Sequence, residues 1–239
     1  MSHMSMDDTS KNIIYKELRR SIITGHRHPG ERFNVEALAA QYNTSVTPVR
    51  DALQMLSQES LVTIKPRSGY FVAQTTLKQL RDMLELRRIL EVASIERAAL
   101  RVTPEQLADL RKVHAGYTGD DDLSYDRYTD ENRNFHYLLA QASGNQELAD
   151  FLGHLHDRLA RFMVLRRGGK SQEITHRRIL DALEVGDVET ARHALEEDID
   201  TSREAILDHL MQEEADSWHL TYRKRNVAGK VNHAGNGRQ

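Results

Sequence analysis

The chain has 239 residues, of which 29% are charged and 39% hydrophobic, a composition ordinary for a globular protein long enough for two domains. It contains no Cys, which excludes disulfides, a thiol nucleophile and a zinc site built from cysteines. No apolar run is long enough to span a membrane, and no signal peptide is recognisable at the start, so we expect a cytoplasmic protein without membrane contact.

The net charge of −3 is unevenly distributed along the chain. Residues 11–73 carry nine Lys or Arg against five Asp or Glu, whereas residues 74–214 carry nineteen against twenty-eight. A basic N-terminal segment joined to an acidic remainder is typical of a DNA-binding domain attached to a domain that does not touch DNA.

The first part of the chain predicts three short helices. Apolar residues recur at helical spacing over 13–23, and residues 35–42 predict a second helix with Asn34 as its N-cap. A third helix begins near Ser45 or Thr47, since either hydroxyl can cap it.

A β-hairpin is predicted to follow the third helix. Two β-type runs, 61–64 and 70–72, flank a turn over 65–69 that contains two cations. Helix, helix, turn, helix and hairpin is the order of a winged helix-turn-helix, in which a helix enters the major groove and the hairpin reaches phosphates or the minor groove. Arg50, near the start of the third helix, would face the bases. The alternative is a solvated helix followed by an ordinary surface hairpin.

This segment resembles the DNA-binding domain of GntR-type bacterial regulators. The resemblance rests mainly on Pro29-Gly30-Glu31-Arg32, Leu38-Ala39, Thr47-Pro48-Val49-Arg50 and Arg67-Ser68-Gly69-Tyr70-Phe71-Val72. It departs from the family at Val46, where the family often has an Arg that reads bases. The DNA contacts that it implies are made by Arg32, Ser45, Thr47, Arg50, Lys65, Arg67, Ser68 and Gly69.

From residue 74 onward the pattern is almost purely helical. The expected helices cover 77–101, a segment from Pro104 to a loop at 116–122, and 125–142, 147–167, 172–184 and 188–214. The fold class is therefore mainly α: a winged helix-turn-helix with a small β-hairpin wing, then an antiparallel helical bundle. The expected boundaries are 11–73 for the first domain, 74–80 for a linker, 81–214 for the bundle and 215–239 for a disordered basic tail.

The helical part resembles the FCD domain, the ligand-sensing domain of the FadR subfamily of GntR regulators. The matching stretches are Leu86-Arg87-Arg88 with Leu90-Glu91, Asn132-Arg133-Asn134-Phe135-His136, Ala142-Ser143-Gly144-Asn145, His176 with Ile179-Leu180-Ala182, and Gly186-Asp187 with Ala191. Together, the two resemblances imply a ligand-responsive repressor that binds a short palindromic DNA operator as a homodimer.

Four positions match the metal ligands that are common in this domain: Asn132, His136, His176 and Asp198. Asn132 replaces the usual Asp and Asp198 replaces the last His, so the net ligand charge stays at −1. Two imidazoles and two oxygens suit a divalent ion such as Zn, Ni, Mn or Fe. The alternative is a set of hydrogen-bonded polar groups that line a pocket without metal. Ligand partners are not evident for His114, His154, His156, His193 and His209, which we interpret as satisfied or exposed histidines.

Arg87 is the candidate effector-binding residue. Spacing alone predicts a surface salt bridge with Glu91, four residues later, whereas the resemblance implies that Arg87 faces the pocket and binds a small carboxylate bidentately. Movement of its helix could then reach the DNA-binding domain through residues 74–80. A metal-dependent enzyme is the alternative function, but the chain has no H-E-x-x-H motif and the winged helix would have no role.

Overall fold

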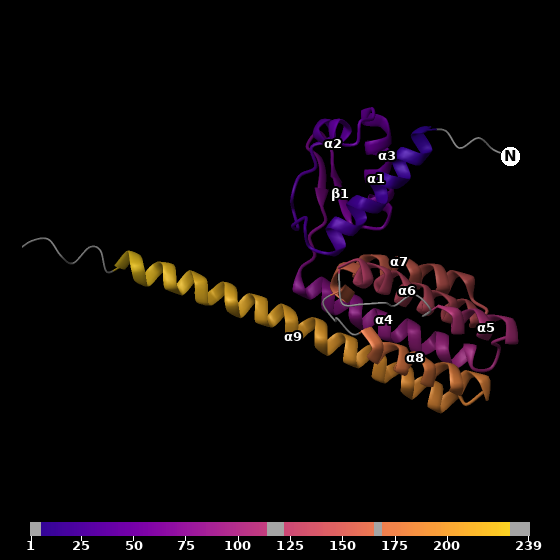
Figure 1. Cartoon of the computed structure of the whole chain (residues 1–239). Coiled ribbons are helices and arrows are strands. Elements are labelled where there is room, and N and C mark those ends of the chain that lie inside the picture. Colours follow the sequence, from indigo (N-terminus) through magenta and orange to yellow (C-terminus); the bar gives the residue numbers. More distant parts are fainter. Residues whose placement is uncertain (1–5, 114–121, 165–168, 230–239) are drawn as a thin grey trace, which may run out of the picture.

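The computed structural model describes residues 6–113, 122–164 and 169–229. A small N-terminal unit packs on one end of a larger helical bundle (Figure 1). The N-terminal unit contains α1 (Met6–Ile23), α2 (Val35–Gln41), α3 (Val46–Gln58), β1 (Val62–Lys65) and β2 (Gly69–Val72). The bundle contains α4 (Leu77–Ala98), α5 (Pro104–Lys112), α6 (Asp122–Ala142), α7 (Gln146–Met163), α8 (Gly169–Glu184) and α9 (Val188–Gly229). The mainly helical fold with an N-terminal winged helix is thus confirmed.

Helix α3 is amphipathic, and its apolar face forms the centre of the N-terminal core. The residues without exposed surface recur at helical spacing: Val49, Ala52, Leu53 and Leu56. They pack against α1, α2 and β1, which leaves the opposite face, with Arg50, exposed. Ser45 takes the N-cap position of α3, although its hydroxyl makes no capping hydrogen bond, whereas the predicted cap Asn34 accepts the Ala37 N–H at 2.9 Å.

The wing is a two-stranded antiparallel hairpin in which Lys65 pairs with Gly69. Arg67, at its tip, has a left-handed backbone with φ of 62°. A neighbouring segment adds to the wing, because the Phe33 N–H donates to the Tyr70 carbonyl at 2.9 Å. Arg32, the residue before Phe33, forms an antiparallel β-bridge with Phe71 and is therefore held beside the hairpin.

The bundle surrounds α4, which packs against α6, α7 and α9. Thr76 and Thr103 begin α4 and α5 with capping boxes, in which the side chain of Gln79 or Gln106 bonds back to the cap. Only residues 73–76 separate α4 from β2, so the connection is shorter than the linker expected over 74–80. None of the helices in the described ranges has the length and apolar character needed to cross a membrane.

Two helices are longer than the sequence pattern predicts. Helix α1 begins at Met6 rather than near residue 13, and α9 continues to Gly229, through much of the tail expected to be disordered from 215. Elongation of an existing helix avoids the nucleation cost, and the extension contains good helix formers such as Ala, Leu, Lys and Arg. The predicted loop at 116–122 lies almost entirely outside the described residues, as do residues 165–167 of the predicted fourth bundle helix and the last ten residues.

The N-terminal unit contacts the bundle through α6 and α7. Arg19 of α1 forms an ion pair with Asp130 of α6 at 2.8 Å. Arg161 of α7 donates to the carbonyl of Ala73 at 2.7 Å. Ala160 of α7 packs into the apolar core of the N-terminal unit. The two parts are thus joined by packing as well as by the chain.

Candidate functional site

The exposed face of the N-terminal unit contains a groove between α3 and the wing. Six of the eight predicted DNA contacts line it: Arg32, Arg50, Lys65, Arg67, Ser68 and Gly69. Ser45 and Thr47 lie outside this lining and are exposed at the first turn of α3. The Lys65 ammonium lies over the ring of Phe71, 4.6 Å from its centroid. This cation–π contact holds the ammonium group close to the wing. Four cations along one groove suit the phosphates of duplex DNA.

A second polar site lies in the core of the bundle, where five helices each contribute at least one buried side chain. It consists of Arg87 and Glu91 on α4, His136 on α6, His156 on α7, His176 on α8 and Asp198 on α9. Each of these residues is at most 2% exposed. So many charged and titratable side chains are buried together mainly when they pair with one another or bind a ligand.

Arg87 is fully buried and is held by the protein itself. Its Nε donates to Glu91 Oε1 at 2.8 Å, and Nη1 lies 3.8 Å from the sulfur of Met163. Its Nη2 lies 3.3 Å from His136 Nε2 and 3.7 Å from Asp198 Oδ2. The sequence left a surface salt bridge and a pocket-facing guanidinium as alternatives. The i, i+4 pair forms, but inside the bundle rather than on its surface.

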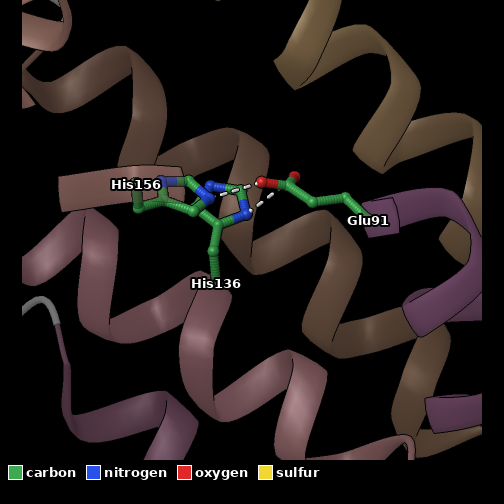
Figure 2. A group of neighbouring side chains, drawn as sticks. All are labelled: Glu91, His136 and His156. Atoms are coloured by element: carbon green, nitrogen blue, oxygen red, sulfur yellow. Dashed lines mark hydrogen bonds and ion pairs between the residues drawn. The ribbon is translucent and has the colours of Figure 1, made fainter. Parts of the chain in front are cut away.

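Glu91 is the hub of this site (Figure 2). Its Oε1 lies 2.6 Å from His156 Nε2, and its Oε2 lies 3.0 Å from His136 Nδ1. Burial alone would raise the pKa of the carboxyl, but Arg87 and the two histidines hold that pKa well below its usual range. Glu91 is therefore a carboxylate with one buried guanidinium as its main counter-charge.

His136 lies between two carboxylates. Its Nδ1 faces Glu91, and its Nε2 lies 3.7 Å from Asp198 Oδ2. Burial lowers the pKa of His136 to about 4, although Glu91 acts in the opposite direction. Burial likewise lowers the pKa of His156. Both rings are neutral near pH 7, which is the form that ligates a metal.

The residues fit a divalent ion. His136, His176 and Asp198, three of the four predicted ligands, form a group in which one ligand atom of each lies within 4.8 Å of the others. The Phe135 ring stacks on His176 with centroids 3.8 Å apart and so fixes the plane of that imidazole. Asn132 is buried one helical turn before His136, where the prediction has it. Two imidazoles, a carboxylate and an amide oxygen are donors suited to Zn or another first-row ion.

Sequence reasoning missed two members of the site. His156 was interpreted as a histidine without ligand partners, and Glu91 as the i, i+4 partner of Arg87. The structure instead places both beside His136, in a second group of metal-type donors. One signal in the sequence was available, since His156 falls on the apolar stripe of its helix between Leu152 and Leu159.

Fold and site together define a DNA-binding winged-helix protein with a helical domain built around a buried polar centre. Residues 11–72 match the family described as bacterial regulatory proteins, gntR family, and residues 82–201 match the FCD domain. The chain therefore belongs to the GntR family of bacterial transcriptional regulators and carries an FCD domain. The family is one of regulators that bind DNA operators, and it gives no support to the enzyme alternative.

Individual relatives agree with this assignment. The chain is 31% identical to an HTH-type transcriptional regulator in an unstable DNA locus of Streptomyces ambofaciens, over 78% of this chain and 80% of that protein. It is 30% identical to the HTH-type transcriptional repressor GlaR of Escherichia coli, over 67% of this chain and 76% of GlaR. The structure of E. coli McbR/YncC has the same fold, with a TM-score of 0.64 at 23% identity over 85% of this chain and 98% of that one.

Proposed function

We propose that this regulator is a repressor that binds a short palindromic operator as a homodimer and responds to a small organic acid in its FCD domain. The observation that carries the effector part is Arg87, a guanidinium without exposed surface in the core of the bundle. It lies beside His136 and Asp198, which are side chains of the kind that hold a divalent ion. Guanidinium is the group best suited to bind a carboxylate bidentately.

At the operator, Arg50 reads base edges, with guanine as its preferred partner, while Arg32, Lys65 and Arg67 contact phosphates. This assignment is supported by the exposure of Arg50 on α3 and by the groove that the four cations line. A homodimer is proposed because one recognition helix reads only a few base pairs, and two helices at a fixed separation read a palindrome.

The DNA part is tested by the affinity for fragments of the promoter region of the gene itself. Arg50→Ala should weaken specific binding by about 1–3 kcal/mol and relax the base preference. Arg81→Ala removes an exposed Arg of α4, outside the groove, and is the matched control. Equal affinity and preference for wild type and Arg50→Ala would contradict the proposed docking.

The effector part involves competition inside the bundle. Because Glu91 Oε1 already accepts from Arg87 Nε, a carboxylate that binds the edge of the guanidinium containing Nε displaces Glu91 from it. A divalent ion held by Asn132, His136, His176 and Asp198 would supply open positions for the oxygens of the acid.

Displacement of Glu91 would shift α4, which begins four residues after the wing. The ion pair between Arg19 and Asp130 gives a second route, through α6, to the DNA-binding unit. A coupling free energy of about 1–3 kcal/mol would weaken operator binding roughly 5- to 150-fold, and operator DNA would weaken effector binding by the same factor.

A titration of operator affinity against a panel of small carboxylic acids tests this part. Arg87→Lys retains the positive charge but not the planar fork, so it should keep operator binding and lose the response to the active acid. A full response in Arg87→Lys, or no response of wild type to any acid in the panel, would contradict Arg87 as the residue that binds the effector.

Light scattering with and without operator DNA measures the mass of the protein in solution and so tests the proposed homodimer.

A further inference from the structure

Glu91, His136 and His156 form a second group of side chains that could hold a metal ion (Figure 2). This group contains the Nδ1 atom of His136, whereas the group with His176 and Asp198 contains its Nε2 atom. We propose that this group is a second position for a divalent cation, held by Glu91 Oε2, His136 Nδ1 and His156 Nε2. It is an alternative to the position between His136 Nε2, His176 and Asp198. The inference deepens the metal part of the proposed function and rests on it.

The distances in this group suit a small divalent ion. Ligand atoms about 2.1 Å from a tetrahedral ion lie roughly 3.4 Å from one another. The contacts are 3.0 Å from His136 Nδ1 to Glu91 Oε2 and 2.6 Å from His156 Nε2 to Glu91 Oε1. In the other group, Asp198 Oδ2 lies 3.7 Å from His136 Nε2 and 3.9 Å from His176 Nε2. The first group is therefore about 0.3–0.5 Å wide of this spacing. In the second group, Oε2 and Nδ1 are about 0.4 Å too close, and His156 Nε2, which now contacts Oε1, has to turn toward Oε2 when the ion binds.

Glu91 Oε2 and His136 Nδ1 face each other across the second position. They lie 3.0 Å apart in a fully buried site, and within the described part of the chain neither atom has a further hydrogen-bond partner. Buried polar atoms of this kind are normally satisfied. A cation bound by both atoms satisfies the carboxylate oxygen and the ring nitrogen together.

The proton of His136 makes the two positions exclusive. A neutral imidazole offers one lone pair to a metal and one N–H to a neighbour, and ligating histidines usually donate that N–H to a carboxylate. With the ion at the Asp198 side, Nδ1–H points to Glu91. With the ion at the Glu91 side, Nε2–H points to Asp198, and Arg87 Nη2, now 3.3 Å from Nε2, has to move away from it because both groups are donors. The formal charge of Arg87, Glu91 and Asp198 is −1, so one divalent ion leaves the buried site at +1, whereas two would leave it at +3.

Metal-stripped full-length protein titrated with Co²⁺ alone tests the second position, with bound ions counted by calorimetry and the ligand set followed by the visible spectrum of Co²⁺. His176→Ala and Asp198→Leu, which leaves no donor atom at 198, each disable the first position. His156→Ala disables the second, and the double variant His156→Ala/His176→Ala disables both. His154→Ala removes an exposed histidine of the same helix as the matched control, and far-UV circular dichroism checks the folding of every variant.

Wild type and the His154→Ala control should bind about one ion per chain. His176→Ala and Asp198→Leu should also bind about one ion, with a changed spectrum, and the added His156→Ala should abolish that binding. The second position is overturned if both folded variants bind no ion while His156→Ala binds as wild type does. Two ions bound at once in wild type would overturn the exclusivity. No ion in folded wild type would overturn both positions, and operator binding would still be decided by its own assay.

Discussion

The buried pair of Arg87 and Glu91 allows a sharp test of how the bundle is stabilised. Arg87→Met keeps much of the side-chain volume but removes the guanidinium that is 2.8 Å from Glu91. Glu91 and Asp198, which lies 3.7 Å from Arg87 Nη2, are then both left buried without the guanidinium. Removing one partner of a buried ion pair typically costs about 3–5 kcal/mol, because the remaining charge stays desolvated and uncompensated.

A loss of this size is a large part of the roughly 5–15 kcal/mol by which domains are usually stable. The double variant Arg87→Met/Glu91→Met replaces both charges of the pair by apolar groups and leaves Asp198 as the one carboxylate that has lost the guanidinium, so it should recover part of the loss. The expected signature is thus strong non-additivity: the double variant is more stable than Arg87→Met alone.

Urea denaturation of metal-free protein, followed by circular dichroism, measures these differences through the midpoint and slope of the bundle transition. Lys78→Met is the matched control, because Lys78 and Asp82 form the same i, i+4 pair on the same helix at 2.6 Å but are largely exposed. This control should show no measurable change. If Arg87→Met were no more destabilising than Lys78→Met, or if the two charge removals were additive, a buried ion pair would not be what stabilises this core.

Three further predictions address other parts of the molecule. Lys65→Ala should weaken binding to specific and non-specific DNA alike and should lower the slope of log K against log salt by about one, as measured by anisotropy titrations at several salt concentrations. In metal-free protein, the unfolded chain protonates His136 with the ordinary pKa of 6.5, but the folded chain does so only near 4. The free energy of unfolding should therefore fall by about 3 kcal/mol as the pH decreases between these values, and His136→Gln should lack this contribution in pH-dependent urea titrations. Asp130→Asn removes the ion pair with Arg19. Operator affinity without effector should stay unchanged, but the factor by which the effector weakens operator binding should become smaller. An unchanged factor would exclude the Arg19–Asp130 contact as a route between the effector site and the DNA-binding unit.

Local signals explain why the part of the N-terminal unit from α2 to the wing could be predicted nearly to the residue. Asn34 caps α2, apolar spacing defines the buried face of α3, and the Lys65-to-Gly69 turn defines the wing, all within short windows of sequence. The ends of α1 and α9 were wrong for the converse reason. Few apolar residues mark these ends, so their helicity depends on elongation rather than on a visible pattern.

The buried centre depends on contacts between distant segments and was only partly predictable. His136, His176 and Asp198 were selected through a family resemblance, and the structure places them together. The contact between Glu91 and His156 joins residues 65 positions apart, and no periodicity within either helix indicates such a partner. The sequence spacing predicted the pairing of Glu91 with Arg87 but could not tell whether the pair was exposed or buried.

The packing of Ala160 has a consequence for protein engineering. Because this residue of α7 belongs to the apolar core of the N-terminal unit, and Arg161 holds the carbonyl of Ala73, the DNA-binding unit is not a free module that ends at the wing. In a chimeric regulator in which residues 11–73 come from a relative, the side chains of that relative would have to pack against the α7 of this protein. Transplanting a new operator preference onto this sensor therefore requires the matching surface of α7 to be exchanged as well.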